Sequence, residues 1–209
     1  MTPKQKPLMV LPEPDRSGRT PLEKALSRRR SVRNFQDSAL SLGELGQILW
    51  AAQGISNSAG LRTAPSAGAL YPLQLYAILK GSDGVRAGIY HYLTSQHALS
   101  PLARGDYRAK FSAAASMQDW TKQAGLILIV AANYARTTVK YGDRGRRYVA
   151  IEAGHAVQNV YLQAVTLGFG ATEVGAFRDA AVAALINLPA DQQPVTSVVV
   201  GRPAKTGQF

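Results

Sequence analysis

The sequence predicts an α+β domain in which helices sandwich a mixed β-sheet. Apolar runs of strand length alternate along the chain with amphipathic helical patterns. The first predicted strand is not followed by a Gly-x-Gly-x-x-Gly segment, and the sequence has no Walker loop, so a Rossmann or P-loop fold is disfavoured. The 209 residues are enough for one domain with a sizeable core.

Helix signals begin after residues 1–19, which we expect to form an extended N-terminal arm because they are rich in proline, glycine and charge. Thr20-Pro21-Leu22-Glu23 has the pattern of a capping box and predicts a helix to about Ser27. Ser41-Leu42-Gly43-Glu44 has the same pattern and predicts a helix ending near Gly54. Residues 20–209 are expected to form a single domain.

Alternating and continuous apolar runs predict the remaining elements. We expect strands at residues 73–80, 88–93, 98–102, 125–134 and 196–200, and helices at 106–116, 147–167 and 179–188. Asp179 is the expected N-cap of the last helix. The helix at 147–167 has few charges of the exposed type, which predicts that it lies in a bundle centre or at a subunit interface.

Composition limits the possible functions. The net charge of +11 favours an anionic ligand. A nucleic-acid-binding module is the alternative, and its affinity for DNA would fall steeply with salt. The chain has no cysteine and only three histidines, without spaced partners, so we expect no metal site. Because no apolar run has the length of a signal peptide or membrane span, we expect a cytoplasmic protein without a membrane partner.

A phosphate-binding pattern occurs at Arg29-Arg30-Ser31-Val32-Arg33. If the chain is extended there, Arg29, Ser31, Arg33 and Phe35 share one face. Two guanidinium groups flanking a hydroxyl suit a phosphate dianion. Basic residues can instead offset the negative end of the preceding helix, which accounts for Arg28 but not for Ser31 or Arg33.

Two other segments are candidates for chemistry. The loop from Pro65 to Leu70 consists mainly of small residues, which let the backbone approach a flat ligand, although a plain connecting loop has a similar composition. Lys140 and Tyr141 lie between a predicted buried strand and a predicted helix. Lysine can act as a base when desolvation lowers its pKa, and tyrosine can relay a proton, but a solvated basic turn is the alternative.

In this order and spacing, the segments resemble the nitroreductase family of flavin enzymes, and most closely its SagB-type azoline dehydrogenase branch. The resemblance runs from about Leu11 to Pro203. Besides the segments above, it rests on Leu49-Trp50-Ala51-Ala52-Gln53-Gly54, Lys140-Tyr141-Gly142-Asp143-Arg144-Gly145, Glu152-Ala153-Gly154-His155, Gln158-Asn159, Val174-Gly175-Ala176-Phe177 and Gly201-Arg202-Pro203. The resemblance implies a nitroreductase-like fold and an obligate homodimer with two FMN sites at its interface.

The resemblance also implies roles for particular residues. The residues implied to bind the flavin phosphate and ribityl chain are Arg29, Arg30, Ser31, Arg33 and Arg202, with the role of Arg30 open. Those implied to contact the flavin ring from the neighbouring subunit are Pro65, Ser66, Ala67, Gly68 and Leu70. Gly175 and Ala176 are implied to lie near the flavin N5. Lys140 is the implied base and Tyr141 its partner.

The implied function is an FMN-dependent oxidoreductase that oxidises thiazoline or oxazoline rings by proton abstraction and hydride transfer to flavin N5. An NAD(P)H-dependent nitro- or quinone reductase is the close alternative, with NAD(P)H as electron donor. A flavin-binding protein without turnover is another. We expect a small-molecule or peptide substrate and no nucleic acid.

Overall fold

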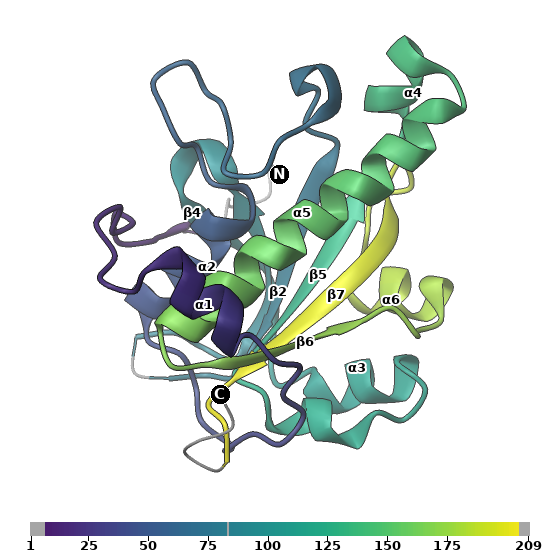
Figure 1. The fold of residues 1–209 in the computed structure, drawn as a ribbon. Helices are drawn as coiled ribbons and strands as arrows, with labels where there is room; N and C mark the ends of the chain where they lie inside the picture. Colours follow the sequence, from purple (N-terminus) through teal and green to yellow (C-terminus); the bar gives the residue numbers. More distant parts are fainter. Residues whose placement is uncertain (1–6, 83, 205–209) are drawn as a thin grey trace.

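The structure is a computed structural model that describes residues 7–82 and 84–204. Its centre is a seven-stranded sheet in the order β1-β4-β3-β2-β5-β7-β6 (Figure 1). The strands are β1 (Met9–Val10), β2 (Leu73–Leu79), β3 (Gly88–Leu93), β4 (Ala98–Arg104), β5 (Leu126–Ala132), β6 (Gly170–Val174) and β7 (Gln193–Gly201). The predicted α+β class is confirmed. The sheet is antiparallel rather than mixed as predicted: all neighbouring strands pair antiparallel, and within the described residues parallel pairing is confined to a bridge between Ser31 and Ala171.

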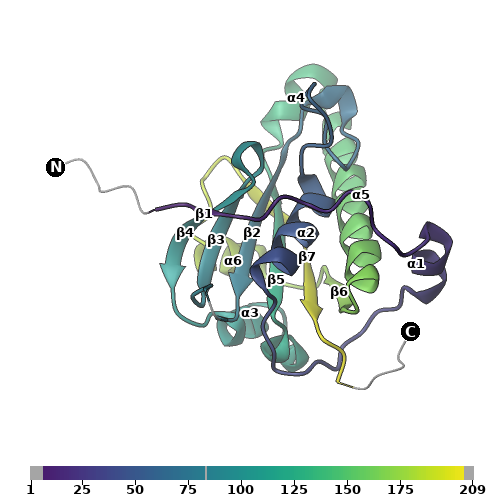
Figure 2. The same cartoon turned by 90° about the vertical axis from the view of Figure 1, so that its left-hand side faces the viewer.

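Helices lie on both faces of the sheet (Figures 1 and 2). They are α1 (Leu22–Arg28), α2 (Leu42–Gln53), α3 (Arg108–Ala114), α4 (Ala135–Tyr141), α5 (Arg144–Thr166) and α6 (Asp179–Leu185), with short 3₁₀ helices η1 (Ala67–Ala69), η2 (Thr94–Gln96) and η3 (Asp119–Gln123). Helices α2 and α5 pack on one face, whereas α3 and α6 pack on the other.

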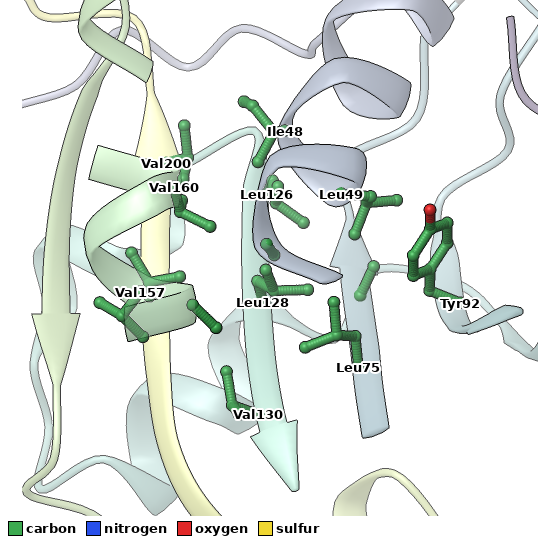
Figure 3. Packing of buried hydrophobic residues seen from close by; sticks show 14 of the residues in the cluster. Ile48, Leu49, Leu75, Tyr92, Leu126, Leu128, Val130, Val157, Val160 and Val200 are labelled. Atoms are coloured by element: carbon green, nitrogen blue, oxygen red, sulfur yellow. The ribbon is translucent and has the colours of Figure 1, made fainter. Parts of the chain in front are cut away.

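Strand β5 lies inside the sheet, between β2 and β7, and both halves of the core pack on it. All its residues are apolar and buried, as expected for a strand covered on both faces. Figure 3 shows Ile48 of α2 and Val157 of α5 in the cluster that packs on Leu128 of β5. On the opposite face, Phe111 of α3 and Val182 of α6 belong to a second buried cluster.

One of the two predicted capping boxes is confirmed. Ser41 Oγ accepts the Glu44 N–H at 3.3 Å, and the Glu44 carboxylate accepts the Ser41 N–H at 2.8 Å. The box predicted at Thr20 is wrong, because Pro21 occupies the N-cap of α1 and no side chain caps it. Asp179 is the first residue of α6 rather than its predicted N-cap, which is Arg178.

The expected arm includes residues 1–6, which lie outside the described residues, and residues 7–19, which form no helix. Strand β1 of this segment pairs with β4, and the Leu11 N–H donates to the His97 carbonyl at 3.0 Å. None of the helices in the described part of the chain has the length and apolarity needed to cross a bilayer.

Candidate active site

The basic segment predicted to bind phosphate runs along the outer edge of β6. Ser31 forms a parallel bridge with Ala171, and the Val32 N–H donates to the Ala171 carbonyl at 3.1 Å. Gly170 allows this close approach, since a Cβ added there would come within 2.5 Å of the Val32 Cβ. The sheet itself therefore fixes the position of Ser31.

The side chains of this segment only partly follow the predicted alternation. Ser31 and Arg33 are exposed, as expected, and Val32 is buried. Phe35 is also buried, so the prediction that it shares the basic face is wrong. After Arg33 the chain leaves β6 and bridges to Pro203, which turns the Phe35 ring into the core.

Arg29 and Arg202 complete a basic cluster at this edge. The Arg29 guanidinium lies 5.4 Å from the centre of the Tyr161 ring, and that of Arg202 lies 4.6 Å from the Phe169 ring. Arg202 also donates to Glu44 Oε1 at 2.7 Å. Aromatic contacts of this kind orient a guanidinium group without consuming its hydrogen-bond donors. We call Arg29, Ser31, Arg33 and Arg202 the basic edge.

The open pocket at the basic edge has a volume of 350 Å³ and is lined by Ser31, Val32, Arg33 and Asn34. Arg30 lies in the same segment but has another task. Its guanidinium donates to the Ser27 carbonyl at 2.9 Å and to the Arg29 carbonyl at 2.8 Å, so it caps the end of α1.

The predicted loop from Pro65 to Leu70 has a strained backbone. Gly68 has a φ of +64°, and the non-glycine residues Ala69 and Tyr71 have φ values of +52° and +46°. Ser66 holds this turn, because its Oγ accepts the Tyr71 N–H at 2.9 Å and donates to Glu152 Oε2 at 2.5 Å.

Glu152 reaches the loop from α5 and is only 2% exposed. Burial raises the pKa of its carboxyl to about 7, against opposing effects of the Ser66 hydrogen bond and the Arg62 charge. Arg62 itself donates to Gln53 Oε1 of α2 at 2.7 Å and lies 4.5 Å from the centre of the Tyr71 ring. Sequence reasoning did not assign Glu152 a role.

Lys140 and Tyr141 lie in the last turn of α4, a helix that the sequence analysis did not predict. A Cβ added at Gly68 would come within 2.8 Å of the Tyr141 hydroxyl and 3.0 Å of Lys140 Nζ, so both functional groups lie against the loop. The Tyr141 ring also packs edge-on against Tyr148 of α5, with ring centres 5.1 Å apart. We call Pro65–Leu70 together with Lys140 and Tyr141 the loop site.

The basic edge and the loop site lie near opposite ends of α5. Tyr148 touches the loop site and Tyr161 touches the basic edge, and the helical rise of about 1.5 Å per residue separates them by about 20 Å. Figures 1 and 2 agree, since both place α4 at one end of α5 and α1 at the other. One chain therefore does not bring all the predicted residues together.

Gly175 and Ala176 follow β6 and are both exposed. At about 3.3 Å per residue, Gly175 lies about 13 Å along β6 from Ala171, the residue beside Ser31. The Ala176 carbonyl accepts a long hydrogen bond from Gln118 Nε2 at 3.4 Å. Strand β6 thus connects the basic edge to the predicted N5 contact within one chain.

The chemistry available differs between the two places. The basic edge offers three guanidinium groups and a hydroxyl to an anion, with Glu44 as the paired carboxylate. The loop site offers an amine and a phenol, groups that can transfer protons, beside a loop of small residues. The described residues contain no cluster of three or more side chains suited to a metal.

Comparison with known proteins shows what the whole chain is similar to. The profile of the Nitroreductase family matches residues 26–202. The Methanocaldococcus jannaschii protein MJ1384 is 42% identical over 181 residues, which cover 87% of this chain and 90% of that protein. The crystal structure of the Ralstonia eutropha protein reut_a1228 superposes with a TM-score of 0.83 at 32% identity, covering 96% of this chain and 91% of the other.

A more distant relative is longer than this chain. The microcin B17-processing protein McbC of Escherichia coli is 28% identical over 144 residues. The match covers 66% of this chain and 52% of McbC, so this chain spans about half the length of that relative.

Proposed function

Because the chain belongs to the nitroreductase family, we propose that it is an FMN-dependent oxidoreductase whose flavin phosphate binds at the basic edge. The family predicted from the sequence is confirmed, and the likeness to McbC supports its SagB-type branch. The observation that carries the proposal is the make-up of the basic edge: Ser31 and Arg33 line an open pocket, and Arg29 and Arg202 each lie against an aromatic ring.

The charges of the basic edge fit a phosphate dianion. Three arginines contribute three positive charges, and the ion pair between Arg202 and Glu44 cancels one of them. The remaining two match the charge of up to −2 that a phosphate monoester carries at neutral pH. Arg29 and Arg202 are already oriented by aromatic rings, so less side-chain freedom is lost on binding.

We infer that the FMN ring lies toward Gly175. An extended ribityl chain separates the phosphate from the ring by about 9 Å, from the lengths of its single bonds. That length covers most of the roughly 13 Å along β6 between Ala171 and Gly175. It is less than half of the roughly 20 Å to the loop site of the same chain. The proposed flavin site is therefore completed by Pro65–Leu70 of a second copy, in a homodimer.

Bound FMN supplies an acceptor of two electrons. We infer that Lys140 takes the proton from the ring carbon of a thiazoline or oxazoline and that Tyr141 holds or relays it. Both groups lie against Gly68, so they reach the same flavin as the loop does. Oxidation of the azoline to the azole is the favoured specific activity.

An NAD(P)H-dependent nitro- or quinone reductase is the second candidate. Lys140 is exposed in the single chain. A reductase of this kind needs no protein base. Steady-state turnover of NAD(P)H with a nitroaromatic substrate that survives Lys140→Ala would favour this candidate.

The test of FMN binding uses the visible flavin absorption of the purified protein and titration with FMN. Arg33→Ala should weaken FMN binding at least tenfold, since a hydrogen bond to a charged group contributes about 1.5–3 kcal/mol. Arg28→Ala is the matched control, because Arg28 is an exposed basic residue of α1 outside the basic edge. A folded protein that neither contains flavin nor is stabilised by added FMN would contradict the proposal.

A mixture of two variants tests whether the site is shared between subunits. In a mixed dimer of Arg33→Ala and Lys140→Ala subunits, a shared site leaves one intact pairing of basic edge and loop site. The mixture should then regain activity that neither variant has alone. If Lys140 serves the flavin of its own subunit, both sites of the mixed dimer are damaged and no activity returns.

A further inference from the structure

Glu152 is a buried ionisable residue that the proposed chemistry does not use. It lies on α5 beneath the loop site, and its Oε1 is buried without a hydrogen-bond partner among the described residues. The amide of Gln53 faces it from α2, and the Gln53 Nε2 is likewise buried without a partner. A buried carboxyl is costly in free energy, so its retention calls for an explanation.

The contacts of Glu152 lead directly to the loop. Its Oε2 accepts the Ser66 hydroxyl, and the same Ser66 oxygen accepts the Tyr71 N–H across the turn. Between these two residues, the chain passes through Gly68 and Ala69, both with positive φ. A left-handed conformation is unfavourable for residues with a Cβ, such as Ala69 and Tyr71, so contacts from outside the turn are needed to keep it in place.

We propose that Glu152 is the positioning residue of the loop site, which through the Ser66 hydroxyl fixes the turn of residues 66–71 against Lys140 and Tyr141. The positioning itself concerns contacts within one chain, and its effect on flavin rests on the proposed function. Glu152 touches neither reacting atoms nor cofactor in this proposal, and it acts through Ser66.

The charges around Glu152 make this hold sensitive to pH. Arg62 faces it from the loop segment and Arg136 from α4, and both favour the ionised carboxylate, as does the neighbouring Gln53 amide of α2. Burial opposes them and raises the pKa of the carboxyl to about 7. A hydrogen bond to a carboxylate is about twice as strong as one to a neutral acid, so the hold on Ser66 weakens as pH falls through 7.

Hydrogen exchange of the Tyr71 amide, in the protein without added flavin, measures how well Ser66 keeps the turn in place, because this amide donates to Ser66 Oγ. Glu152→Ala and Ser66→Ala should each speed this exchange by about tenfold or more at pH 8, because the turn loses a charge-assisted hydrogen bond. Glu152→Gln retains an acceptor for Ser66 and should restore most of the protection. In the wild type the Tyr71 protection factor should fall between pH 8 and pH 6, whereas in Glu152→Gln it should not.

Asp119→Asn is the matched control. Asp119 also accepts a serine hydroxyl, from Ser112 at 3.0 Å, but it lies with α3 on the other side of the sheet. This variant should leave Tyr71 exchange unchanged.

Unchanged Tyr71 exchange in Glu152→Ala, or a pH dependence that persists in Glu152→Gln, would overturn the positioning role. The dissociation constant of FMN, measured on the same variants, separates this failure from that of the proposed function. If Glu152→Ala frees the Tyr71 amide but FMN affinity is unaltered, the positioning role stands and the contact of this loop with flavin is wrong.

Discussion

The buried carboxyl of Glu152 predicts a specific pH dependence of stability. Its pKa is about 7 in the folded protein and about 4.5, the ordinary value, in the unfolded chain. Between these pH values the folded state holds a proton that the unfolded state has released. The free energy of unfolding from this group is therefore greatest below pH 4.5 and falls as pH rises to 7.

The size of the effect follows from the difference between the two pKa values. Each pH unit within the window changes the free energy of unfolding by about 1.4 kcal/mol, so the whole window contributes about 1–3 kcal/mol, with the lower value applying if the ionised carboxylate draws in water. For a chain of this length, that corresponds to about 2–12 °C in the melting temperature. Glu152→Gln is uncharged at every pH and should lack this decline.

Thermal unfolding of wild type and Glu152→Gln, followed by circular dichroism from pH 5 to pH 8 without added flavin, measures the difference. Comparing the two proteins is essential, because burial lowers the pKa of His91 and of His97, which makes wild-type stability rise with pH in part of this window. Both histidines are present in the variant, so their contribution cancels. The melting temperature of Glu152→Gln relative to wild type should increase up to about pH 7, and a difference that stays flat from pH 5 to pH 8 would refute the reasoning.

Three further predictions concern single residues. Gly68→Ala should reduce FMN affinity and the activity of the loaded enzyme, because the added methyl group meets the Lys-Tyr pair of the loop site and the φ is positive, and FMN titration checks this. Ser41→Ala should destabilise the fold by about 1 kcal/mol in urea unfolding, because the capping box with Glu44 is lost, and an unchanged midpoint would contradict that role. Arg108→Met should destabilise the fold by about 1–3 kcal/mol in the same assay, because the buried guanidinium no longer donates to the half-exposed Asp106 carboxylate or to the Ala124 carbonyl; the loss should shrink when Asp106 is also replaced by Asn.

The sequence predicted the elements that apolar patterns define, and it missed those that depend on context. The buried run of β5 and the capping box at Ser41 are local signals, and both hold in the structure. Helix α4 carries threonine and valine within Ala135–Tyr141 and has no side-chain N-cap, so its sequence gives little helical signal. Strand β6 is short and begins with Gly170, which lacks the side chain that would collide with Val32.

The residues of the candidate site also divide into those that local sequence predicts and those that depend on the fold. Arg29, Ser31 and Arg33 are neighbours in sequence, so their pattern could be recognised without the structure. The burial of Phe35 could not, because it depends on Pro203 at the far end of the chain. The role of Glu152 was not predicted, because its partner Ser66 is 86 residues away and only the fold brings them together. The assignment of catalytic and cofactor-binding residues stays a prediction, as do the homodimer, the cytoplasmic location and the lack of nucleic-acid binding.

The exposed face of α5 connects these observations to the proposed dimer. Ile151 is 46% exposed, and Gly154, His155 and Gln158 are also exposed, on a helix whose composition predicted burial on most sides. This face lies between Tyr148 at the loop site and Tyr161 at the basic edge. If two copies of α5 pack antiparallel along it, the first half of each helix lies against the second half of the other. The loop site of each subunit then approaches the basic edge of its partner, which is the pairing that a single chain, with the two places about 20 Å apart, cannot make.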